Sequence, residues 1–324
     1  MVDESKFTVG PGEFKQPKTA LTANNVLSFL TAVQQDGASK AAKKFAADES
    51  LLYYIVDAHR IESPITTKDE FKLDKARQNA QEQVEDLKEN KRQKELENLE
   101  QGHANAAILE QALIPLNDSC LWFGENTRLS KSHEYDDWLN NTDLVMTLLP
   151  ENEGEQPLYL AIDVTVSNDS SVLEKKINKI YSEIERGTLT TIKYFEDEKT
   201  REPITLNLVP RVIWPMDRET MEKFKKQIAD YFSSKNRAAA ENSDIPYALL
   251  LIIEKQLANG VNHLNNTEQR LKRLGLKISN YEIIKHNIQK MWLEINKRLE
   301  ARQKICGVGK LDNLQQFVAN FKLK

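Results

Sequence analysis

The first part of the chain has the spacing of apolar side chains that is typical of helices. Residues 21–60 contain two segments in which a capping residue precedes an apolar face, "TANNVLSFLTAVQQ" and "ADESLLYYIVDAHR". Residues 67–101 lack proline and glycine and carry one narrow apolar stripe, formed by Leu73, Ala76, Ala80, Val84 and Leu87. Such a stripe suits a coiled-coil contact with one other helix. We expect Gly102 to end or kink this helix, and a second helix, "HANAAILEQALI", to run up to Pro115.

Between residues 117 and 216 the pattern changes to short runs rich in β-branched and aromatic residues. The runs that predict strands are "CLWFG", "TDLVMTLL", "PLYLAIDVTVS", "TTIKYFE" and "ITLNLVPRVIW". Among them lies "SVLEKKINKIYSEIERG", a predicted helix with an apolar face of Val172, Ile177, Ile180 and Ile184 and an end at Gly187. The pattern therefore predicts an α+β protein with a small mixed β-sheet core flanked by helices.

After Asp217 the pattern is helical again almost to the end. Two helical segments, "RETMEKFKKQIADYFSS" and "DIPYALLLIIEKQLANG", precede a predicted basic helix over residues 268–304. The chain thus divides into a flexible arm (1–20), a helical N-terminal region with the long charged helix (21–104), an α/β core (105–216) and a helical C-terminal region (217–324).

Composition limits the classes of protein to which the chain can belong. The chain has 324 residues, of which 40% are hydrophobic and 29% are charged, as in a globular protein. It contains no apolar run of about 18 residues and no secretory signal at its start, so we expect no membrane contact and a cytoplasmic location. The two cysteines, Cys120 and Cys306, lack metal-ligand spacing, and the five histidines are scattered without zinc spacing.

Charge is distributed unevenly although the net charge is only −4. From Glu268 to Lys324, lysine and arginine clearly outnumber aspartate and glutamate, which predicts either a nucleic-acid-binding surface or a solvated helix face. The candidate nucleic-acid-binding residues on the basic helix are Arg270, Lys272, Arg273, Lys277, Lys290, Lys297 and Arg298. Arg128, ahead of the first strong strand, could hold a phosphate with its planar guanidinium. The long helices also suit a homodimer or a partner helix.

Two aspartates stand in otherwise apolar strands. Asp143 lies at the start of one predicted strand and Asp163 near the end of the next. If these strands are antiparallel neighbours, both carboxylates lie at the same end of the sheet, where they repel unless a proton or a cation lies between them. Oxygen-rich sites of this kind suit Mg²⁺ or Mn²⁺. Asp137, just upstream, is a further candidate metal ligand.

The order of a helix with an acid, two strands with aspartates, a helix and a strand resembles the PD-(D/E)xK nuclease superfamily over residues 105–215. The resemblance implies that Asp143 and Asp163 hold the metal and that Glu110 is the helix acid found in part of the family. It also implies a lysine that positions or activates the attacking water. Thr165 stands where the lysine is expected, and the first strand reads Thr142–Asp143 without the proline.

Some members of the family supply the lysine from the following helix, where Lys175 and Lys176 are the candidates. Val172 and Ile180 mark the apolar face of that helix, and Lys176 lies on the same face, one turn from each. We therefore predict Lys176 as the catalytic lysine. The sequence favours a metal-dependent nuclease that hydrolyses phosphodiester bonds of DNA or RNA. The alternative is an inactive nuclease-fold protein that binds nucleic acid or serves as a helical scaffold.

Overall fold

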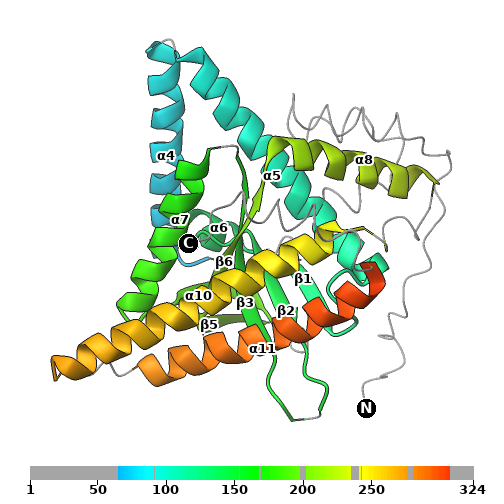
Figure 1. Ribbon diagram of the computed structural model, residues 1–324. Helices are drawn as coiled ribbons and strands as arrows, with labels where there is room; N and C mark the ends of the chain where they lie inside the picture. Colours follow the sequence, from blue (N-terminus) through cyan, green and yellow to red (C-terminus); the bar gives the residue numbers. More distant parts are fainter. Residues whose placement is uncertain are drawn as a thin grey trace, which may run out of the picture.

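The computed structural model describes residues 65–90, 92–152, 154–167, 169–197, 202–234, 241, 243–275 and 280–306. The arm 1–20 and the helices predicted within 21–60 lie outside these residues. The helices, seen in Figure 1, are α4 (Thr67–Glu89), α5 (Gln93–Cys120), α6 (Glu134–Asn140), α7 (Ser170–Glu185), α8 (Arg218–Ser234), α10 (Ile245–Arg273) and α11 (Tyr281–Cys306). The strands are β1 (Thr127–Lys131), β2 (Leu144–Leu148), β3 (Leu158–Val166), β4 (Thr190–Glu196), β5 (Pro203–Val209) and β6 (Arg211–Met216). The predicted α+β class with a small mixed sheet is confirmed.

The central sheet has the strand order β1-β2-β3-β6. Its first three strands are antiparallel neighbours, with Leu144 opposite Ile162 in the β2–β3 pair. The last strand, β6, runs parallel to β3, and α7 and the separate β4–β5 hairpin lie between them in the sequence. Helices α10 and α11 cross one side of this sheet, and α4 and α5 meet at an angle beyond its edge (Figure 1).

The two faces of β2 and β3 pack against different partners. One face belongs to the main core and consists of Leu144, Met146, Leu148, Leu160, Ile162, Val164 and Val166. The opposite face carries Val145 and Ala161, which pack against Ile192, Phe195 and Val209 of the β4–β5 hairpin. Because side chains alternate along a strand, Asp163 and Thr165 lie on the same face as Ala161.

The N-terminal helices end elsewhere than the sequence predicts. The break falls between α4 and α5, near Asn90, whereas α5 continues through both Gly102 and Pro115. Residues 108–110 and 112–117 of α5 are all buried, and this packing outweighs the poor helix propensity of Pro115. The prediction that Gly102 or Pro115 ends a helix is therefore wrong.

Two strand predictions also need correction. The segment "CLWFG" is not a strand, because α5 ends at Cys120 and the chain turns at Leu121 and Gly124, both with positive φ. The strand at this point is β1, Thr127–Lys131, whose residues are polar except for the buried Leu129. The run "ITLNLVPRVIW" divides at Pro210 into β5 and β6.

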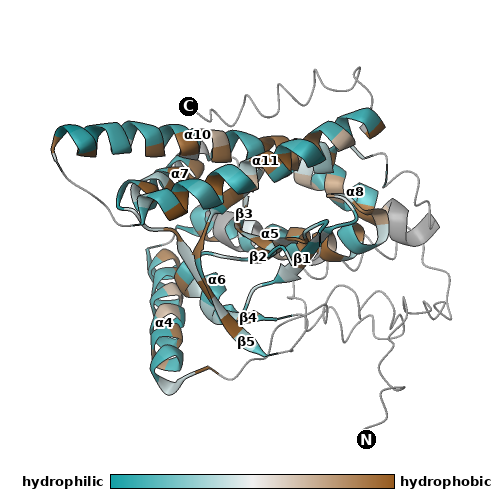
Figure 2. Cartoon of the chain, turned by 90° about the horizontal axis from the view of Figure 1, so that it is seen from below, coloured by the Kyte–Doolittle hydropathy of each residue, from teal (hydrophilic) through white to brown (hydrophobic). Residues whose placement is uncertain are grey.

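The predicted basic helix over residues 268–304 is wrong as a single element. α10 ends at Arg273, Gly275 has a φ of 68°, and α11 begins at Tyr281. The two helices lie side by side in both views, and much of their outer surface is hydrophilic (Figure 2). Their buried stripes include Ile253 and Leu257 of α10 and Ile284 and Ile288 of α11. None of the described helices is long and apolar enough to cross a membrane.

Candidate active site

The candidate site lies where β2 begins and β3 ends. Asp143 directly precedes β2, and its backbone N–H donates to the carbonyl of Ile162 at 2.9 Å. Its side-chain Oδ2 accepts from the backbone N–H of Val164 at 2.6 Å. These two hydrogen bonds flank Asp163 on the neighbouring strand. The structure therefore brings Asp143 and Asp163 to the same end of the sheet.

Lys176 reaches Asp163 from helix α7, whose start is capped by the side chain of Asp169. The Lys176 Nζ donates to Asp163 Oδ1 at 2.6 Å and to Thr165 Oγ1 at 2.7 Å. The Thr165 hydroxyl in turn donates to Asp163 Oδ1 at 3.2 Å. The Asp163 side chain is 7% exposed and that of Lys176 is 35% exposed. Neighbouring Lys175 is exposed, so the helix phase distinguishes the two lysines as the sequence predicts.

A second ion pair joins the same end of the sheet to α5. Glu110 is buried on α5, and its Oε2 lies 3.1 Å from Nζ of Lys131, the last residue of β1. The following residue, Ser132, donates its backbone N–H to the carbonyl of Asp143 at 3.0 Å. The structure thus brings Glu110 to the site as predicted. Lys131 was missed, because the polar segment that forms β1 shows no strand pattern.

Asp137 comes from the short helix α6, which begins after His133 and ends before Asn141, a residue with a φ of 52°. Its carboxyl lies within hydrogen-bonding reach of Asp143, and this interaction favours the ionised form of Asp137. Two carboxyl groups can share a hydrogen bond only when one of them carries a proton. Asp137, predicted as a further metal ligand, therefore belongs to the same cluster of acids.

The four acids act on one another electrostatically. Burial raises the pKa of Asp143 well above its usual value, and the nearby carboxylates of Glu110, Asp163 and Asp137 raise it further. Burial also raises the pKa of Glu110 and of Asp137, although Lys131 opposes the rise in both. Asp143 and Asp137 are partly buried as residues. Without a cation, Asp143, Glu110 and Asp137 therefore bind protons more tightly than isolated acids do.

His103 of α5 is a further neighbour of the site that was not predicted from the sequence. It lies two helical turns before Glu110 on α5 and therefore on a similar side of the helix. The residue as a whole is exposed, yet burial of its ring lowers its pKa, and the positive charge of Lys176 lowers it further. Asp137 has the opposite effect. The seven-residue spacing of His103 and Glu110 on one helix was a signal in the sequence, whereas the proximity of His103 to Lys176 and Asp137 depends on the fold.

The donor types and charges of the cluster fit Mg²⁺ or Mn²⁺. All four acids offer oxygen ligands, and a divalent cation would offset the repulsion that adds to burial in raising the pKa of Asp143. Within the described ranges, no three His, Cys, Asp or Glu side chains already form a metal-coordinating group. In the present arrangement, ion pairs with Lys176 and Lys131 satisfy Asp163 and Glu110 instead.

The predicted nucleic-acid-binding residues are not gathered on one helix. Arg128 is exposed on β1, while Arg270, Lys272 and Arg273 belong to the last turn of α10. Lys290, Lys297 and Arg298 belong to α11, and Lys277 lies outside the described residues. Lys272 pairs with Glu268, and Lys297 pairs with Glu294 at 2.5 Å.

Arg298, predicted to bind nucleic acid, is largely enclosed by the protein. Its side chain is 13% exposed, and its Nε donates to Thr127 Oγ1 at 2.8 Å. It also pairs with Glu294 one turn earlier on α11. Arg298 therefore joins α11 to the start of β1, and we assign it a structural role.

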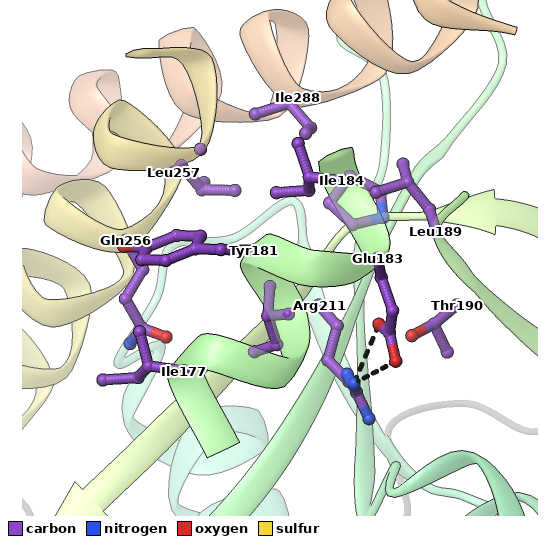
Figure 3. Close-up of a pocket in the computed structure, with 13 residues that line it drawn as sticks. Ile177, Tyr181, Glu183, Ile184, Leu189, Thr190, Arg211, Gln256, Leu257 and Ile288 are labelled. Carbon is purple, nitrogen blue, oxygen red and sulfur yellow. Dashed lines mark hydrogen bonds and ion pairs between the residues drawn. The ribbon is translucent and has the colours of Figure 1, made fainter. Parts of the chain in front are cut away.

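A separate small cavity lies between α7, α10 and the start of β6 (Figure 3). Beside it, Arg211 Nη2 lies 2.8 Å from both carboxylate oxygens of Glu183, and its Nη1 donates to the carbonyl of Asn140 at 3.0 Å. The other lining residues are mostly apolar, among them Ile184 and Leu257. With about 20 Å³ of free space, the cavity has room for roughly one water molecule. This feature serves packing rather than ligand binding.

No family model, curated protein or solved structure matches the chain. The function of the acid and lysine cluster is therefore inferred from its own geometry and chemistry.

Proposed function

We propose that the chain is a divalent-metal-dependent nuclease of the PD-(D/E)xK type that hydrolyses phosphodiester bonds in DNA or RNA. The observation that carries this proposal is the contact of Lys176 with Asp163 and Thr165. Lys176 places an ammonium group next to the second acid. In the motif this group comes from a lysine at the position where this chain has Thr165.

The order of the site residues along the fold supports the same proposal. Glu110 comes from α5, Asp143 from the start of β2, Asp163 from β3 and Lys176 from α7, and β6 then pairs in parallel with β3. β1 and α6 stand between the first two elements, and the β4–β5 hairpin stands between α7 and β6. This is the order on which the resemblance to the nuclease superfamily rests.

Asp143, Asp163 and Glu110 would hold the cation, with Asp137 as a fourth oxygen donor. A bound Mg²⁺ or Mn²⁺ supplies positive charge for the scissile phosphate and makes a water molecule more acidic. Lys176 uses two of its three N–H donors on Asp163 and Thr165, and the third is directed by these two contacts. This donor would bind the attacking water or a phosphate oxygen.

The alternative is a nucleic-acid-binding protein without nuclease activity. The observation that favours it is that Lys176 and Lys131 already neutralise two of the four acids without a metal. In such a protein the cluster would only hold α5, α7 and the sheet together. Metal-dependent cleavage separates the two functions.

The test is a cleavage assay on single- and double-stranded DNA and on RNA with Mg²⁺, Mn²⁺ or a chelator. We expect cleavage by the wild-type chain with metal and none with the chelator. Asp163→Asn should remove the activity, and Asp86→Asn, at an exposed position on α4, should retain it. A folded wild-type chain that cleaves none of the substrates with either metal would contradict the proposal.

A further inference from the structure

Lys131 lies in the candidate site, although the nuclease motif does not include a lysine at this position. It is the last residue of β1 and lies opposite Leu144, the first residue of β2. Its ammonium group is 3.1 Å from Glu110 Oε2, and the two side chains are 23% and 10% exposed. The pair therefore has one partly accessible partner, the lysine, and one enclosed partner, the acid. Lys131 also acts on Asp137 of α6, which shows that its charge reaches across the cluster.

The charges around Lys131 do not balance without a cation. The candidate site itself holds four acids (Glu110, Asp137, Asp143 and Asp163) and two lysines (Lys131 and Lys176). With all acids ionised, the cluster is negative and repels a phosphodiester, which is itself an anion. A divalent cation would bring the cluster close to neutrality. A phosphate could then approach the lysines.

We propose that Lys131 is a substrate-binding residue: when a divalent cation takes over the Glu110 carboxylate, Lys131 leaves it and binds a phosphate of the nucleic acid. This inference rests on the proposed nuclease function. A lysine suits the exchange because its charge sits at the end of a flexible four-carbon chain and binds phosphate as a point charge. One side chain would thus connect the cation to the substrate.

The exchange has a thermodynamic consequence. If cation binding frees Lys131 for phosphate, the cation strengthens nucleic-acid binding, and by linkage nucleic acid strengthens cation binding by the same factor. Replacement of Lys131 by an uncharged residue removes a competitor for Glu110. Metal affinity without nucleic acid should therefore rise while the mutual strengthening disappears.

The experiment measures two affinities, neither of which depends on catalysis. Mn²⁺ binding is followed by calorimetry, and binding of a phosphorothioate oligonucleotide, which resists cleavage, is followed by fluorescence anisotropy with and without Mn²⁺. We expect Lys131→Gln to bind Mn²⁺ about fivefold more tightly, since no ion pair has to be broken. The strengthening of oligonucleotide binding by Mn²⁺ should be lost. Lys131→Arg should retain most of this strengthening by Mn²⁺. Lys175→Gln, at an exposed position on α7, should behave as wild type.

A second measurement uses the wild-type chain and does not depend on how a variant folds. Modification of lysines by an amine-reactive reagent is quantified by peptide mass spectrometry. The reactivity of Lys131 should rise when Mn²⁺ is added and fall again with the oligonucleotide, whereas that of Lys175 should not respond to Mn²⁺.

The outcomes distinguish this inference from the function on which it rests. If the wild type cleaves with Mn²⁺ but Lys131→Gln leaves both affinities and their coupling unchanged, Lys131 is only a structural ion-pair partner and the inference is overturned. Unchanged Lys131 reactivity on addition of Mn²⁺ to an active chain overturns it as well. If the wild type neither binds Mn²⁺ nor cleaves, the proposed function fails and the role of Lys131 fails with it.

Discussion

The ammonium group of Lys176 lies 2.6 Å from the carboxylate of Asp163, a contact between a helix and the strand that precedes it. Thr165, two residues after Asp163 on the same face of β3, accepts a second hydrogen bond from the same nitrogen. A lysine is thus placed beside the second acid although the strand itself provides none. This arrangement is the basis for the proposed catalytic role of Lys176.

Substitution of Lys176 by methionine tests that role at similar side-chain volume. We expect the rate of cleavage at saturating metal to fall by about a hundredfold or more, the usual effect of removing a positioned proton donor. Mn²⁺ should still bind, because the acids remain. Lys175→Met, one position away and exposed, is the matched control and should cleave as wild type. Equal loss in both variants would point to a general effect on α7.

The raised pKa values of three acids predict how the stability of the fold depends on pH. The pKa values of Asp143, Glu110 and Asp137 are raised in the folded chain, so folding takes up protons that the unfolded chain would release. The stabilisation by these protons is complete below the ordinary carboxyl pKa and is lost as pH rises through the folded values. Denaturant unfolding without metal should therefore show a free energy of unfolding that falls over this range, and Mg²⁺ should reduce the fall.

Asp143→Asn should stabilise the metal-free chain at neutral pH. Asparagine keeps an oxygen that accepts from Val164 N–H and removes a buried carboxyl group that must take up a proton or repel the neighbouring acids. We expect a gain of about 1 kcal/mol in the free energy of unfolding. Added Mg²⁺ should stabilise the wild type and have little effect on the variant. A less stable variant without metal would show that the carboxylate is satisfied by its surroundings and needs no cation.

We expect Asp69 to hold the start of α4 against β4. Its side chain is 1% exposed, pairs with Lys193, and accepts a hydrogen bond from the Tyr194 hydroxyl at 2.9 Å. Contact with Lys193 holds the pKa of Asp69 well below its usual value, so its contribution to stability is present above that value and is lost as pH falls. Asp69→Asn should cost about 2 kcal/mol and speed amide hydrogen exchange along α4. Asp74→Asn, at a position whose side chain is 63% exposed, is the control and should change little.

The ion pair of Arg211 and Glu183 should be worth more to stability than exposed pairs. The Arg211 side chain is 4% exposed, so removal of its partner leaves a guanidinium charge in the interior. We expect Glu183→Gln to lower the free energy of unfolding by about 3 kcal/mol in denaturant titrations. Glu219→Gln breaks a pair at the same 2.8 Å separation but on the exposed surface of α8, and should cost less than about 0.5 kcal/mol. Similar costs for the two variants would contradict this account of burial.

The parts of the fold that the sequence predicts are those where pattern and packing agree. β2 and β3 read as apolar runs because both of their faces are buried, one in the main core and the other against the β4–β5 hairpin, so Asp143 and Asp163 contrast with their surroundings in the sequence. The phase of α7 follows from Val172 and Ile180, and the same phase selects Lys176 over Lys175. These features depend on neighbours close in sequence.

The features that could not be predicted from the sequence depend on partners that lie far away along the chain. β1 forms from polar residues because it pairs with β2, which local pattern cannot show. α5 continues through Pro115 because its apolar side is buried, and the basic segment divides at Gly275 because α11 returns along α10. Lys131 and His103 reach the candidate site only through these tertiary arrangements.

The most direct test of the account moves the lysine back to the motif position. Cleavage rates with Mn²⁺ are compared for Lys176→Ala, for Thr165→Lys combined with Lys176→Ala, and for Thr165→Met combined with Lys176→Ala as the uncharged control. Because the Lys176 nitrogen lies 2.7 Å from Thr165 Oγ1, removal of its side chain leaves room for a lysine at position 165. If Lys176 performs the work of the motif lysine, the first variant is inactive, the lysine double variant regains much of the activity and the methionine variant does not. An active Lys176→Ala chain, or an inactive lysine double variant that folds and binds Mn²⁺, would contradict the account.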